Sequence, residues 1–228
     1  QTFSMTIKEE NNKYHIWQKR LKRLRNEVSQ MLIARHVFWK IQDIIRSNPR
    51  IQTGNLFYKW LGDAYVTDML IRIRRQGAPT RADDISFSQL LKEIGEHSQV
   101  LSWKRFKNLY RGSLVKDFAR RDFKKHFGWK KIIKQEHINP AMARRDHREL
   151  NKLIKKLKWF TDKRIAHLSI KKTRRKLKFD DLRPALDFLE KLVIKYELII
   201  NASNYGNSIF PAGGEEWIEV FRVPWIPD

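Results

Sequence analysis

The sequence predicts an all-α fold, a helical bundle with a long N-terminal helix and an irregular C-terminal tail. Apolar residues recur at three- and four-residue steps along most of the chain, which is the spacing of one helix face. Interruptions of this pattern coincide with glycine and proline. From Asn201 onward the chain is rich in glycine, proline and asparagine. We therefore expect no sheet larger than a small terminal hairpin.

The first half of the chain contains three expected helices. The first covers residues 8–46, as one helix or two joined helices, and a Ser-Asn-Pro run at 47–49 ends it. The second covers 55–76 and ends at Gly-Ala-Pro in 77–79. A shorter helix over 86–98 begins at a serine, a residue type that caps helix N-termini well.

The second half is less regular. Short helices are expected after Trp103, and glycines interrupt them. A proline in the first turn begins a long helix over 140–169. Asp180 or Asp181 is expected to cap the last helix, and residues 217–221 are expected to form a short extended piece. These elements indicate a helical domain over 1–200, with a basic insertion around 101–145, followed by a tail over 201–228.

Composition limits the functional classes. The 228 residues include no cysteine, which excludes disulfides, thiolate zinc sites and cysteine nucleophiles. The histidines lack ligand spacing, so we expect no metal and no cofactor. No uninterrupted apolar run approaches 18 residues and no secretory signal opens the chain, so a cytoplasmic protein with no membrane partner is expected.

The net charge of +23 is concentrated in one part of the chain. Residues 101–180 carry 27 basic and 7 acidic side chains, a net charge of +20. Such a field attracts polyanions through counterion release. RNA or another nucleic acid is therefore the first expected partner, and an acidic protein, such as an antitoxin, is the second.

One helical run carries a candidate catalytic group. Asp162, Lys163, Arg164 and His167 stand near the end of the long helix. At 100° per residue, Arg164 lies about 40° and His167 about 20° from the direction of Phe160, on the apolar stripe. A cation and an imidazole on an apolar face need a partner, such as a carboxylate, an interface or a polyanion. The alternative is a core histidine with a satisfied hydrogen bond.

The order of these features resembles HEPN-domain proteins, in particular the abortive-infection branch found in phage-defence loci. The resemblance covers about residues 10–200, and its tightest motif is the Asp-Lys-x-x-Ala-His run ending at His167. It implies a HEPN-like bundle, a two-fold homodimer and, in active members, a metal-independent ribonuclease. It also implies that a histidine serves as general acid or base and that an arginine four to six residues earlier steadies charge. Here Thr161 occupies the expected arginine position, and Arg164 is three residues before His167.

Further residues are candidates for RNA contact or support. Residues 171–178, the polybasic connector, are too polar for a core and directly follow the helix that carries His167. Asp68 and Arg72 lie four residues apart on one helix face and form either a salt bridge or a support for His167. Asp162 and Lys163 are further candidates for supporting His167. Aromatic residues over 103–129 alternate with cations and form either a core or base-stacking platforms. The RNA-binding candidates in the connector are Lys171, Lys172, Arg174, Arg175, Lys176 and Lys178.

Two hypotheses follow. The first is an RNA-acting, HEPN-like endoribonuclease toxin or defence effector that uses His167 and Arg164 and requires no metal. The second is a non-catalytic, basic nucleic-acid-binding or partner-binding helical protein that keeps the fold. Thr161 favours the second, and the basic connector fits both.

Overall fold

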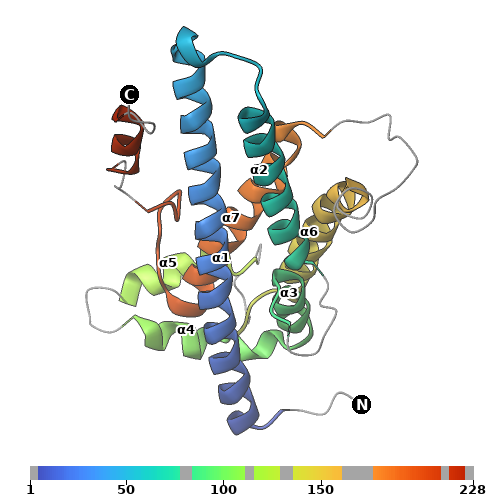
Figure 1. Ribbon diagram of the computed structural model, residues 1–228. Helices are drawn as coiled ribbons and strands as arrows, with labels where there is room; N and C mark the ends of the chain where they lie inside the picture. The colour runs from blue at the N-terminus through green and yellow to red at the C-terminus, as the bar shows by residue number, and fades with distance from the viewer. Residues whose placement is uncertain are drawn as a thin grey trace.

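The computed structural model describes residues 5–77, 84–110, 116–128, 136–160, 177–211 and 216–223 (Figure 1). Within these ranges the chain forms seven α-helices and short 3-10 turns, with no β-strand. An isolated bridge joins Ser102 and His137. The all-α prediction is confirmed.

Helix α1 (Ile7–Ser47) is one continuous helix that runs the length of the molecule (Figure 1). It begins at a capping box, in which Thr6 Oγ1 accepts a hydrogen bond from the Glu9 amide at 3.3 Å and the Glu9 carboxylate accepts one from the Thr6 amide at 2.7 Å. It ends at Asn48, and Pro49 starts the short 3-10 turn η1 (Pro49–Ile51). The joined-helix alternative is therefore excluded.

Helix α7 (Arg183–Asn201) packs along α1 and completes the centre of the bundle. The hydroxyl of Tyr14 donates to the carbonyl of Ile200 at 2.5 Å, which satisfies a polar group inside this contact. Both helices bury apolar residues at three- and four-residue steps, as expected for facing stripes. The buried apolar residues are Trp17, Leu21, Leu24, Val28 and Met31 on α1 and Leu186, Leu189, Val193 and Tyr196 on α7.

Helices α2 (Leu56–Arg75), α3 (Phe87–Glu96) and α6 (Pro140–Phe160) surround this pair. Asn55 and Ser86 cap the first two, each accepting a hydrogen bond from the amide three residues later. Helix α3 continues into the 3-10 turn η2 (Ser98–Val100) and packs extensively on α6. The remaining part of the predicted 140–169 helix lies outside the described residues.

Helices α4 (Trp103–Leu109) and α5 (Lys116–His126) form a small layer on α7. Their buried rings touch one another, with centroids of Phe106 and Phe127 at 4.7 Å and of Phe123 and Phe127 at 4.1 Å. After α5 the chain turns at Gly128, whose φ is +78°. A Cβ there would stand 2.9 Å from Met142 Sδ, so glycine lets the end of α5 approach α6.

Two local predictions were wrong. The last helix is preceded by the 3-10 turn η5 (Phe179–Asp181), and its N-cap is Leu182, whose side chain makes no capping bond. The proline at position 184 lacks an amide hydrogen, which reduces the need for a cap. The segment predicted as extended at 217–221 lies in the 3-10 helix η6 (Glu216–Arg222), where Glu219 and Arg222 pair at 3.2 Å; residues three apart stack above one another in a 3-10 helix but not in an extended strand.

Candidate nucleic-acid interface

The outer face of α6 is cationic. Helical geometry places its seven lysines and arginines within about half of the helix circumference. The opposite side buries Leu150, Leu157 and Phe160 against the core, as the predicted apolar stripe requires. All seven cations are exposed, and they are Arg144, Arg145, Arg148, Lys152, Lys155, Lys156 and Lys158.

Few carboxylates offset this face. Helix α6 contains two acidic residues. Glu149 approaches Lys152 at 3.9 Å, and Asp146 is buried on the inner side. The helix therefore presents a strongly positive surface to solvent, of the kind that attracts a polyanion.

The predicted catalytic pair cannot be placed. Arg164 and His167 lie outside the described residues, and so do the supporting Asp162 and Lys163. The same holds for all but one of the connector residues, namely Lys171, Lys172, Arg174, Arg175 and Lys176. Lys178 is described and exposed, and its backbone amide donates to Asp181 Oδ2 at 2.9 Å. The backbone at Lys178 is thus held at the start of the 3-10 turn η5.

Both ends of this undescribed run attach to the core. Phe160, the last described residue of α6, is 4 % exposed. After the run, the Phe179 ring packs against Phe38 and Trp39 of α1, with centroids 4.9 and 6.0 Å away. A Cβ on Gly62 of α2 would lie 3.3 Å from this ring. Described residues close to both ends of this run are therefore packed against other helices, Phe160 in the core and Phe179 on α1.

The predicted supporting pair forms an ion pair on α2. Arg72 Nε donates to the two carboxylate oxygens of Asp68 at 2.8 and 2.9 Å. Arg72 also approaches Glu27 of α1 at 3.3 Å. These contacts, led by the hydrogen bond to Asp68, raise the pKa of the Arg72 guanidinium. The salt-bridge interpretation is confirmed, and the cluster links α1 to α2; support of His167 stays a prediction.

The aromatic residues after Trp103 mainly form core. Phe106, Phe123 and Phe127 are buried and are thus not platforms for bases. Phe118 is exposed, and the guanidinium of Arg121 stacks on it at 4.7 Å from the ring centroid. Of the two hypotheses for this segment, the structure favours aromatic rings that form part of the hydrophobic core.

Two polar clusters in the structure were not predicted from the sequence. His147 Nε2 lies 2.9 Å from Ser88 Oγ and 3.0 Å from Asn151 Nδ2. Burial, followed by the charge of Lys92, lowers the His147 pKa. Ser88 is buried, so this cluster ties α3 to α6 and offers no accessible nucleophile. The i, i+4 spacing of His147 and Asn151 was its only sequence signal.

The second cluster points the other way from α6. Asp146 Oδ2 accepts hydrogen bonds from Tyr196 Oη at 3.0 Å and Lys195 Nζ at 2.5 Å, both on α7. Tyr196 is fully buried, and burial with the neighbouring carboxylate raises its pKa well above the usual value. Asp146 and the adjacent His147 thus face different helices, α7 and α3 respectively.

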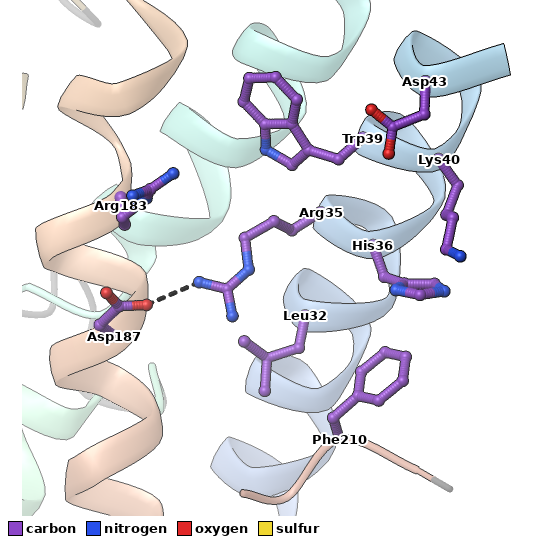
Figure 2. Close-up of a pocket in the computed structure, with 9 residues that line it drawn as sticks. All are labelled: Leu32, Arg35, His36, Trp39, Lys40, Asp43, Arg183, Asp187 and Phe210. Atoms are coloured by element: carbon purple, nitrogen blue, oxygen red, sulfur yellow. Dashed lines mark hydrogen bonds and ion pairs between the residues drawn. The ribbon is translucent and has the colours of Figure 1, made fainter. Parts of the chain in front are cut away.

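A hollow of about 520 Å³ separates α1 from the first turns of α7 (Figure 2). Arg35 extends across it and pairs with Asp187 at 2.7 Å, and Glu190 lies 4.0 Å from the same guanidinium. The His36 ring packs on Phe210 at 4.9 Å. The central cation of this α1–α7 hollow is therefore already neutralised.

Among the described residues, no group of three or more histidine or acidic side chains is arranged to hold a metal ion. None of the helices in those ranges is both long and apolar enough to cross a membrane.

Comparison with protein families gives a match over residues 15–213, which is most of the chain, to the family model of AbiU2, a HEPN family. Comparisons with curated proteins and with solved structures gave no significant match.

Proposed function

This chain belongs to the AbiU2 family of HEPN-superfamily abortive-infection proteins, and from that premise we propose that it acts on RNA as a metal-independent endoribonuclease of a defence system. The cationic outer face of α6 is the observation that supports RNA binding most directly. This face leads along the chain straight into the run with Arg164 and His167. A bound strand would thereby be held next to the proposed catalytic residues.

In the proposed reaction the RNA 2′-oxygen attacks the adjacent phosphorus. The bond from O2′ to phosphorus forms, and the bond from phosphorus to O5′ breaks. His167 accepts the 2′-hydroxyl proton, and in a homodimer the second His167 donates a proton to the leaving 5′-oxygen. Arg164 stabilises the charge that develops on the phosphate. The cations of α6 and the connector hold the backbone.

A second candidate function is RNA binding without cleavage. Thr161 stands where the family pattern has arginine, and this observation favours it. Both candidates require the basic surface, whereas the endoribonuclease alone requires His167. Substitution of His167 alone therefore distinguishes the two candidate functions.

RNA binding is tested by fluorescence anisotropy with a labelled single strand. We expect affinity to fall on the order of tenfold or more between 50 and 200 mM salt, because bound cations displace counterions. A flat response would instead indicate an acidic protein partner recognised by shape.

Cleavage is tested with His167→Ala, in parallel with His15→Ala on the exposed side of α1 as a matched control. We expect His167→Ala to lose about 100-fold or more of the cleavage rate while RNA affinity and melting temperature stay unchanged. Arg164→Ala should also slow cleavage, and activity should persist in a chelator. Wild-type protein that binds RNA without cutting it would establish the second candidate. Unchanged cleavage by His167→Ala would refute the catalytic assignment.

A further inference from the structure

A second, larger hollow lies between α5, α6 and α7, and we refer to it as the α5–α6–α7 groove. Its volume is about 1050 Å³. The turn after α7 closes one side, where the amide of Gly206 donates to Asn204 Oδ1 at 2.9 Å. Five cationic side chains and one carboxylate, that of Asp122, line it. The cations are Arg121, Lys125, Arg145, Lys191 and Lys195.

The carboxylates near the groove leave most of this charge uncompensated. Asp122 accepts a hydrogen bond from Tyr110 at 2.8 Å and lies 3.6 Å from Arg121. The buried Asp146 carboxylate pairs with Lys195 and neutralises its charge. Within the described ranges, the other three cations form no ion pair with a carboxylate. These three are Lys125, Arg145 and Lys191, and all are exposed.

The arrangement of the cations suits a chain of phosphates. Arg121 and Lys125 are four residues apart on α5, and Lys191 and Lys195 are four apart on α7. Residues at this spacing lie on one helix side, about 5–6 Å apart at Cβ, which is comparable to the separation of neighbouring phosphates. Arg145 of α6 adds a cation beside these two pairs.

The lining also indicates what the groove does not recognise. None of the described lining residues is phenylalanine, tyrosine or tryptophan, and Met142, Ile194 and Leu198 supply its apolar part. Bases stack on aromatic rings or guanidinium planes, and among these lining residues the only such groups are the imidazole of His126 and the two arginines. A strand bound here would be held mainly by its backbone.

We propose that the α5–α6–α7 groove binds the phosphodiester backbone of single-stranded RNA through Lys125, Arg145 and Lys191. This inference rests on the proposed RNA function and names a site for it formed by residues other than the predicted catalytic ones. Arg145 also belongs to the cationic face of α6, so the groove continues that surface. His126 lines the groove too, and burial followed by the nearby Lys125 lowers its pKa, as expected in a positive field.

The test compares two triple charge reversals by anisotropy with labelled uridine and adenosine dodecamers. One is Lys125→Glu, Arg145→Glu, Lys191→Glu in the groove. The control is Lys19→Glu, Lys22→Glu, Arg23→Glu on exposed positions of α1 that do not line it. We expect the groove variant to lose about 10- to 100-fold in affinity for both oligomers and the control less than about threefold.

Each remaining outcome overturns a defined claim. Equal losses in both variants would show that net charge, not the groove, binds RNA. Unchanged binding by the groove variant, with binding by wild type intact, would refute the groove alone. No binding by wild type would refute the proposed function itself. Poly-glutamate bound as tightly as RNA would assign the groove to an acidic protein. A glutamine triple at the same positions, with thermal melts, guards against misfolding.

Discussion

The two hollows that flank α7 differ in how their cations are matched. In the α1–α7 hollow, Arg35 crosses to Asp187 and Glu190, so its charge is compensated inside the protein. In the α5–α6–α7 groove, Lys125 and Lys191 meet no carboxylate within the described ranges. Both hollows are lined by arginine and lysine. Pairing, and not the number of cations, therefore distinguishes a structural contact from a candidate anion site.

The difference originates in the charge pattern of α7. Two of its acidic residues, Asp187 and Glu190, approach Arg35 of α1, whereas Lys191 and Lys195 line the groove shared with α5 and α6. One helix thus neutralises the hollow on one side and adds positive charge on the other.

The largest effect is expected where the groove meets the core. Asp146→Ala should remove the carboxylate that accepts from Lys195 and the buried Tyr196 hydroxyl. Leaving these donors unpaired should destabilise the fold by about 2–4 kcal/mol. Thermal unfolding should show a loss of about 5–15 °C. RNA affinity measured below the transition should not fall, because a negative charge beside the groove has been removed.

Asp146→Asn is the matched control, because it keeps an acceptor for the tyrosine hydroxyl and should lose less stability than the alanine variant. If Asp146→Ala melted within about 2 °C of wild type, this carboxylate would not hold α6 to α7.

A smaller effect is expected from breaking the α1–α7 hollow. Arg35 and Asp187 are both partly exposed, and such pairs contribute about 0.2–1 kcal/mol. A double-mutant cycle with Arg35→Ala and Asp187→Ala should give a coupling energy in that range by urea unfolding. RNA affinity should change by less than about twofold in Arg35→Ala. A tenfold loss would show that Arg35 binds RNA despite its partners, and the comparison would fail.

The smallest effect concerns the protonation of His126. Burial lowers its pKa, Lys125 and Lys195 lower it further, and Asp122 opposes them. The folded state therefore binds fewer protons than the unfolded chain, whose histidine pKa is about 6.5. Its contribution to stability is present above that pH and is lost as the pH falls below it. An NMR titration of the ring should show the lowered pKa.

Adding a uridine oligomer should raise the His126 pKa, because a phosphate in the groove favours the imidazolium. Lys125→Gln should raise it in the free protein for the same electrostatic reason. A titration that the oligomer leaves in place would indicate that no phosphate enters beside this ring.

Local features of the fold could be predicted from the sequence. Periodic apolar residues located the main helices within a few residues, because burial of one helix face leaves a repeating pattern. Ser86 and Asn55 mark helix starts because the capping bond lies within one turn. The ion pair of Asp68 and Arg72 could also be predicted from the sequence, since residues four apart on a helix are neighbours.

The concentration of positive charge, too, was determined by the sequence alone, whereas only the tertiary structure decided which cations are compensated. Arg35 and Asp187 are 152 residues apart, and no local pattern connects them. Asp146 is buried under Lys195 because α6 packs on α7, and Lys191, which lines the groove beside other cations, forms no ion pair with a carboxylate in the described part of the chain. Electrostatic pairing depends on distances of a few ångströms between side chains, and folding alone brings such distant segments together.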